Sequence, residues 1–201
     1  PLHLGLYKGQ IEVVEYLIEE CRANIEAKDK DGRTPLHFAL TNVHTEVVKY
    51  LIEECHANIV AKDKNGLIPL HLASALGQIG VVKYLIEQRH ANVKVKSNDG
   101  CTPLHFASIN GKIEVVKYLI EDCHANVKVK SNDGCTPLHL ASSKGQIEVV
   151  KYLVEQRNAN VAVRNNYGNN SLHLALINNQ EEVAGYLFSV FLQKRIKLAL
   201  I

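Results

Sequence analysis

The sequence contains no tryptophan and no methionine, and only 6% of its residues are aromatic. Since it lacks methionine, we expect a fragment or a processed form of a longer chain, and a removed targeting segment remains an open alternative. Apolar runs are only a few residues long, far short of the roughly 20 that a membrane-spanning helix needs, so no span is expected. The formal net charge is only +2, which gives no reason to expect nucleic acid or a membrane as a partner.

Proline is scarce, and all five prolines belong to one recurring motif. Thr-Pro-Leu-His stands at 34–37, 102–105 and 136–139, with variants at 68–71 and 171–173 and a partial copy at 1–3. The proline position of the motif falls at 1, 35, 69, 103, 137 and 171, so the interval is constant. A unit of this size cannot bury a core alone and must pack its apolar face on its neighbours. The sequence therefore predicts a continuous array of stacked units.

The residue pattern of each unit predicts a turn, a short helix, a loop, a second helix and an extended segment (the extended return) that leads to the next turn. In the unit 99–132 the Asp-Gly pair marks the turn, and the threonine hydroxyl caps the first helix. Pro103 starts that helix, and Gly111 ends it. Apolar spacing places the second helix over about 112–122, and the alternating segment 125–132 is β-prone.

We expect one domain over residues 1–201 with about six units. Identity between residues 91–105 and 125–139 indicates a recent duplication or a designed array. The last unit is degenerate and ends in an apolar extended helix, which either folds back over that unit or continues into further sequence. The expected units are 1–30 (partial), 31–64, 65–98, 99–132, 133–166 and 167–201.

The repeat content resembles the ankyrin repeat family across essentially the whole chain. A tetratricopeptide unit has the same length, about 34 residues, but its pattern wants a tryptophan, which is absent here. The ankyrin signature Asp-Gly-x-Thr-Pro-Leu-His stands at 31–37, 99–105 and 133–139, with inter-helix glycines at 77, 111 and 145. The resemblance implies an all-α solenoid of stacked helix-loop-helix repeats with short β-hairpin turns, acting in protein–protein interaction.

The chain departs from the family pattern in two places. The usual unit has roughly 33 residues and a glycine after the second helix, whereas Glu53 to Asn58 carries an extra residue and no glycine. We therefore expect the second helix to end differently, one residue longer. Val43 and Asn179 also stand where a glycine usually separates the two helices.

Histidine and cysteine invite a search for a metal or catalytic site. Six histidines (3, 37, 71, 105, 139 and 173) share one repeat position, so we expect them to bond turn backbone. Adjacent pairs such as Cys55 and His56 do not face one site on a helix, and zinc-type spacing is absent. Cys101 and His105 recur as a pair one unit later, which is implausible for a nucleophile and its base. The sequence thus predicts no catalytic residue, metal or cofactor, and no enzyme.

The five cysteines follow the repeat and not a disulfide plan. One repeat position holds Cys21, Cys55 and Cys123, and another holds Cys101 and Cys135. This placement, together with the odd number, favours a reducing compartment, so we expect a cytoplasmic location.

Lysine recurs on the extended returns, with Lys94, Lys96, Lys128 and Lys130 in the two identical segments. Glutamate recurs on the second helices, so the sequence predicts a basic hairpin edge and a more acidic helical back. Three interpretations stay open: solubility with protection of exposed edges, steering of a partly acidic partner segment, and phosphate binding.

In the ankyrin family the hairpin tips and first helices line a concave groove that contacts partners. Some expected groove residues are apolar without an evident need of the fold, which favours a peptide or protein contact face, although scattered surface apolars are an equal alternative. The groove positions carried over by resemblance are Tyr7, Lys8, Lys30, Arg33, Thr41, Asn42, Lys64, Leu67, Ala75, Leu76, Asn98, Cys101, Ile109, Asn110, Asn132, Cys135, Ser143, Lys144, Asn166, Asn169, Ile177 and Asn178.

The function expected from the sequence is a non-enzymatic interaction module with a rigid concave groove for a partner protein or an extended, partly acidic peptide. Nucleic acid and membranes are not expected as partners. Two other classes stay open. One is an array that associates weakly end to end through uncapped ends, and the other is a targeting domain of a larger enzyme or effector.

Overall fold

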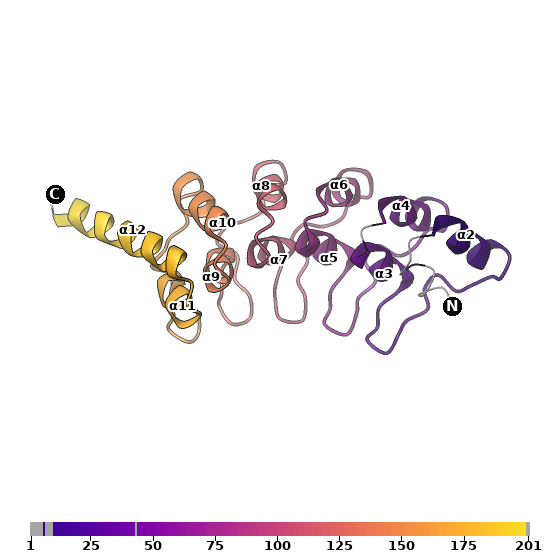
Figure 1. Cartoon of the computed structure of the whole chain (residues 1–201), viewed down its shortest axis with the longest axis horizontal. Helices are drawn as coiled ribbons and strands as arrows, with labels where there is room; N and C mark the ends of the chain where they lie inside the picture. The colour runs from indigo at the N-terminus through magenta and orange to yellow at the C-terminus, as the bar shows by residue number, and fades with distance from the viewer. Residues whose placement is uncertain (1–5, 7–9, 43, 200–201) are drawn as a thin grey trace.

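The computed structural model describes residue 6, residues 10–42 and residues 44–199. Its helices form two rows along an elongated body, with α2 and α12 at opposite ends of the long axis (Figure 1). Neighbouring helices of the first row contact one another from α3 to α11, so the expected all-α solenoid is confirmed. The first row consists of α3 (Pro35–Thr41), α5 (Pro69–Leu76), α7 (Pro103–Ile109), α9 (Pro137–Ser143) and α11 (Ser171–Ile177).

The second row packs against the first. In the unit 99–132 its helix is Ile113–Glu121, within the expected range. The row consists of α2 (Ile11–Glu19), α4 (Thr45–Glu53), α6 (Ile79–Lys83) with η1 (Tyr84–Gln88), α8 (Ile113–Glu121), α10 (Ile147–Lys151) with η2 (Tyr152–Gln156), and α12 (Glu181–Ala199). α12 is one continuous helix that runs on past α11 (Figure 1), so within the described residues the C-terminal helix does not fold back over the last unit.

Loops with the outline of a hairpin connect the units. Each is closed by a backbone hydrogen bond, such as that from the Ser131 N–H to the Cys135 carbonyl at 2.9 Å. The expectation of an extended segment at 125–132 is wrong, since the described chain has no β-strand there or elsewhere. The cause is local: Asn126 accepts from the Lys128 N–H with its side chain and from the Val129 N–H with its carbonyl. These bonds close a turn where a strand would need free N–H groups.

The extra residue of each unit is absorbed in the last turn of the second helix. In α8 the Cys123 N–H reaches back five residues to the Tyr118 carbonyl, and the Ala125 N–H reaches six back to Leu119. His124 between them has a φ of +53°, in the left-handed region that glycine usually occupies. In the units 65–98 and 133–166 the widened turn is a full π-helical turn, η1 or η2. Asn179 has a φ of +55° and takes the place of the inter-helix glycine, while Val43 lies outside the described residues.

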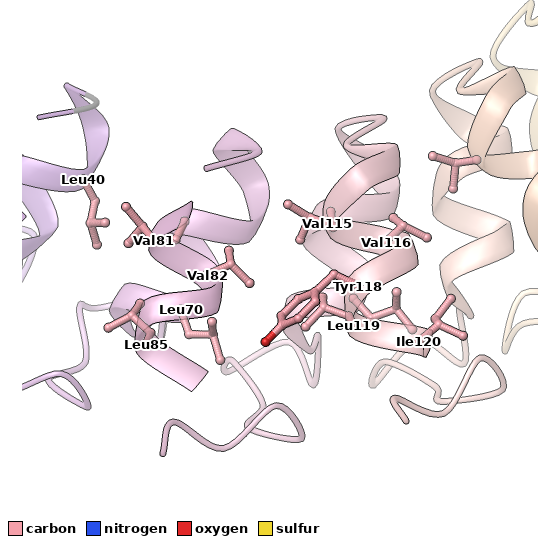
Figure 2. Packing of buried hydrophobic residues seen from close by; sticks show 14 of the residues in the cluster. Leu40, Leu70, Val81, Val82, Leu85, Val115, Val116, Tyr118, Leu119 and Ile120 are labelled. Carbon is pink, nitrogen blue, oxygen red and sulfur yellow. The ribbon is translucent and has the colours of Figure 1, made fainter. Parts of the chain in front are cut away.

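Aliphatic side chains fill the space between the rows and between neighbouring units. Leu104, Val116 and Leu119 are at most 1% exposed, and each belongs to one core cluster that runs through the array. In Figure 2 residues of α6 and α8 lie in line along this core. Burying a leucine-sized side chain contributes about 1.5–3 kcal/mol. Stability therefore comes from contacts between units, as expected for a solenoid.

A polar ladder on the second row links most of the described units to the one before. The Tyr118 hydroxyl donates to a Glu87 carboxylate oxygen at 2.9 Å, and Lys83 lies over the Tyr118 ring at 5.3 Å from its centroid. Tyr152 and Tyr186 repeat the hydrogen bond to glutamates of the preceding units at the same distance. These bonds fix the spacing of neighbouring second helices.

Candidate functional site

The recurring histidines bond turn backbone, as expected for those that the structure describes. His105 is 0% exposed, and its Nδ1 accepts from the Thr102 N–H at 3.1 Å. Its Nε2 lies 3.1 Å from the Cys135 carbonyl of the next unit. Since Nδ1 accepts, the imidazole is neutral with its proton on Nε2. His3 lies outside the described residues.

Burial keeps these imidazoles neutral. It lowers the pKa of His71 and of His105 to about 4, against the raising effect of the carbonyls that face them. The pKa values of His37 and His139 are lowered for the same reason. A neutral imidazole with both nitrogens engaged in backbone bonds has no free atom for proton transfer.

The hairpin tips are joined into a ladder that runs along the array. The Asn132 N–H donates to the Asp99 carbonyl at 2.9 Å, and its side-chain amide donates to the Asn98 carbonyl at 2.8 Å. The same pair of bonds recurs at Asn98 and at Asn166. The tips approach so closely that a Cβ on Gly100 would lie 2.3 Å from Asn132 Oδ1. These asparagines, expected as groove contacts, thus hold the tips at a fixed spacing.

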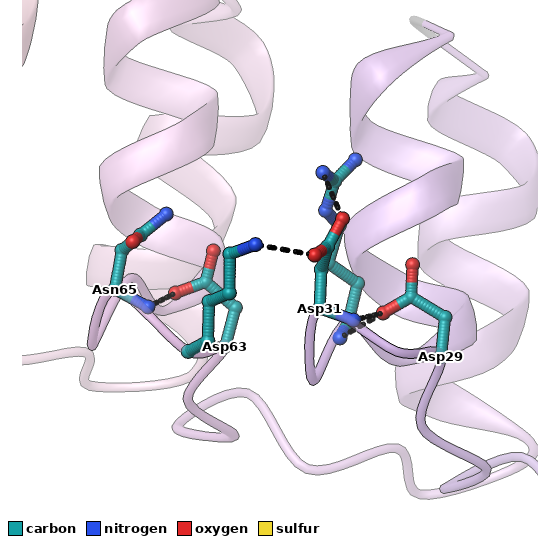
Figure 3. A network of polar contacts seen from close by, with 6 residues as sticks. Asp29, Asp31, Asp63 and Asn65 are labelled. Atoms are coloured by element: carbon teal, nitrogen blue, oxygen red, sulfur yellow. Dashed lines mark hydrogen bonds and ion pairs between the residues drawn. The ribbon is translucent and has the colours of Figure 1, made fainter.

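At the first described tip, charge pairs replace the side-chain amide bond of this ladder, while its backbone bond remains, from the Lys64 N–H to the Asp31 carbonyl at 2.9 Å. Asp31 pairs with Arg33 and with Lys64 of the next unit, and the pKa of the Asp31 carboxyl is lowered mainly by the bond to Lys64 (Figure 3). Behind this pair, Asp29 accepts from the N–H groups of Asp31 and Arg33 at 2.8 Å. Arg33 and Lys64, both expected in the groove, are therefore engaged within the tips.

Several other expected groove side chains bond the carbonyls at the end of their own first helix. The Asn110 amide donates to the Phe106 carbonyl at 2.8 Å, and Asn178 does the same to Leu174. Thr41 and Asn42 bond the Phe38 carbonyl, and Ser143 bonds that of Leu140.

The remaining expected groove positions differ in their exposure to solvent. Lys30 and Lys144 are exposed, and Leu67, Ala75 and Asn169 are half-buried. Leu76 is 40% and Ile177 is 64% exposed. Tyr7 and Lys8 lie outside the described residues.

Three expected groove residues meet at one pocket between neighbouring units. Cys101, Ile109 and Cys135 line a cavity of about 260 Å³ between the α7 and α9 units. Sequence reasoning missed other members of its wall, although the position after each recurring histidine is phenylalanine or leucine in every described unit. The missed residues include Asp99, Phe106, Asp133 and Leu140. The result is an apolar pocket with two carboxylates beside it, suited to an apolar side chain of a ligand.

Cys101 of this pocket is a poor nucleophile. Burial raises the pKa of Cys101 to about 11, so its thiol is protonated at neutral pH. Cys135 Sγ accepts a hydrogen bond from the Asn165 amide at 3.4 Å. Over the described part of the chain, no group of three or more His, Cys, Asp or Glu residues could hold a metal ion. The same part contains no helix that is long and apolar enough to cross a membrane.

Comparison with known proteins bears on the whole array. A family model for ankyrin repeats, built for three copies, matches residues 2–97, 56–131 and 123–197. No curated protein matches the chain.

Proposed function

The chain belongs to the ankyrin repeat family, whose repeats are generally protein–protein interaction modules, and from this premise we propose that it is a non-enzymatic module that binds a partner through the concave groove. The ligand is an extended segment of another protein. The observation that carries this proposal is the pocket at Cys101, Ile109 and Cys135, because it offers an apolar site within the expected groove.

Pre-organisation of the groove supports this function. The backbone bonds between successive tips, each 2.9 Å long, hold the loop tips in place before any ligand binds. A receptor that is already ordered loses little conformational entropy on binding. Binding of an extended segment therefore does not require the groove to fold around it.

The charge beside the pocket indicates what the ligand carries there. Asp99 and Asp133 flank the apolar wall, so a neutral or basic residue of the ligand fits next to its anchoring apolar side chain. The lysines that suggested an acidic ligand line two other pockets. All five cysteines are free thiols, which supports our proposal of a reducing, intracellular location.

Selection from a displayed library of disordered peptides tests the proposal. We expect enriched peptides to bind the whole chain, and Ile109→Asp to weaken them at least about tenfold, because it adds a third carboxylate to the pocket. Val60→Asp is the control, since Val60 is an exposed aliphatic residue (57%) outside the pocket. Failure to enrich any peptide, or equal losses in both variants, would contradict the proposal.

Association end to end is a second candidate. Leu176 is 58% exposed, although the equivalent Ser142 of the preceding unit is 0% exposed. Phe188 and Leu192 on α12 are 56% and 45% exposed. Sedimentation equilibrium tests this candidate: a mass that rises with concentration supports it, and a monomer at every concentration rejects it.

A further inference from the structure

Two equivalent pockets lie beside the part of each loop that leads from the second helix to the tip, and they are separate from the pocket at Cys101 and Cys135. Their volumes are about 320 and 270 Å³, and each lining position of one recurs at the equivalent repeat position of the other. Neither shares a residue with the pocket at Cys101 and Cys135. The residues that matter are Val93, Lys94, Lys96, Leu104, Ala125 and Val129 in one, and Val127, Lys128, Lys130, Leu138, Ala159 and Val163 in the other.

Each pocket combines an apolar wall with two lysines. Valine, alanine and leucine side chains form most of the wall, one threonine and one asparagine complete it, and the four lysines are all exposed. Within the described residues none of the four forms an ion pair. Lys96 Nζ donates to the Lys130 carbonyl at 3.4 Å, which holds one ammonium between the two pockets.

Positive charge is concentrated on these two loops. Segments 91–98 and 125–132 each carry two lysines and no carboxylate. The equivalent loops of the first two units carry Asp29 and Asp63 where these loops carry serine. Four ammonium groups without an ion pair among the described residues lie over two largely apolar pockets. They favour a ligand that supplies both carboxylates and apolar side chains.

We propose that the two pockets form a second binding face, distinct from the groove, for an extended acidic segment of a partner protein. Neighbouring helices pack about 8–10 Å apart, which sets the separation of equivalent pockets. A polyproline II segment places residues i and i+3 on one side, about 9 Å apart. The ligand therefore carries apolar residues three positions apart, one for each pocket, with carboxylates between them that meet the lysines.

The apolar walls distinguish this ligand from a phosphate or a nucleic acid. Either would satisfy the lysines but would leave about 270–320 Å³ of apolar cavity unfilled. A protein segment fills the pockets and pairs the charges at the same time. This face does not depend on the groove, so each can fail without the other.

Fluorescence anisotropy of a labelled peptide, (Pro-Leu-Asp) repeated three times, against the whole chain tests the proposal. We expect saturable binding that weakens as salt rises. Replacing leucine by serine, aspartate by asparagine, or moving the leucines two positions apart should each weaken binding at least about tenfold. No binding, or a serine peptide that binds as tightly as the leucine peptide, overturns the proposal.

Matched protein variants locate the binding face. The test variant carries K94Q, K96Q, K128Q and K130Q, and we expect it to weaken the peptide at least about tenfold. The control removes the same charge from four exposed second-helix lysines that also share one repeat position: Lys49, Lys83, Lys117 and Lys151. The control and Ile109→Asp should each stay within about twofold of the unchanged chain. Equal losses in test and control, or full competition by inorganic phosphate or a short DNA duplex, overturn the proposal.

Discussion

Mild acid should lower the free energy of unfolding of the array, because its buried histidines are neutral in the folded state. In the unfolded chain His71 and His105 have the ordinary pKa of 6.5, and burial lowers the folded values to about 4. Both imidazoles are neutral in both states above pH 6.5, so their full contribution is present there. As the pH falls from 6.5 towards 4, only the unfolded chain takes up the protons, and stability is lost.

The size of this loss follows from the two pKa values. Linkage between 6.5 and about 4 removes about 2 kcal/mol per histidine on going from about pH 8 to about pH 5. His71 and His105 together lose about 4 kcal/mol, and His37 and His139 add to the loss in the same direction. With a urea dependence of about 3 kcal/mol per molar, the unfolding midpoint should fall by more than about 1 M.

Urea unfolding followed by circular dichroism, at about pH 8 and about pH 5, measures the effect. His105→Asn removes one titrating group, so its loss between the two pH values should be about 2 kcal/mol smaller than that of the unchanged chain. His124→Asn is the control, because it makes the same histidine-to-asparagine change at an exposed position. A midpoint that does not move with pH, or an H105N variant that moves as far as the unchanged chain, would refute the reasoning.

Five further substitutions, two of them controls, test the features that set the unit length and the unit contacts. His124→Gly should raise the free energy of unfolding by about 0.5–1 kcal/mol in urea titrations, because glycine relieves the φ of +53°, whereas His124→Ala should give no gain. Gly100→Ala should cost more than about 2 kcal/mol, since its Cβ would meet the next tip. Gly80→Ala, in open space on α6, should instead stabilise by about 0.5–1 kcal/mol in the same titrations. Tyr118→Phe should cost about 1 kcal/mol by leaving Glu87 unpaired, and an equal stability of the two chains would contradict the ladder.

Much of the fold can be predicted from the sequence because its signals are local. Pro103 fixes the start of α7, and the apolar spacing places α8 within one residue of its observed ends. The end of the second helix was predicted only in part: the extra residue was expected to lengthen it, but nothing in the sequence marks His124 as the residue that adopts a left-handed conformation. The alternating valines of 125–132 suggested a strand, but Asn126 closes a turn there instead.

The candidate groove was less predictable because its contacts join separate units. Cys101, Ile109 and Cys135 do line one pocket, as the repeat positions suggested. Asn132 was expected to face a ligand, yet its amide bonds the neighbouring tip. The lysines of the loops were read as one basic edge. Sequence could not show which pocket they line, because that depends on how the two arms of each loop pack.

Nuclear magnetic resonance mapping of the bound peptide tests the central claim, binding in the concave groove, most directly. A peptide selected on the whole chain is titrated into the isotopically labelled protein. We predict that the largest amide shifts fall on Cys101, Phe106, Ile109 and Cys135, while α8 on the second row stays unchanged. Largest shifts on α4, α8 and α10, with the groove unchanged, would contradict the account.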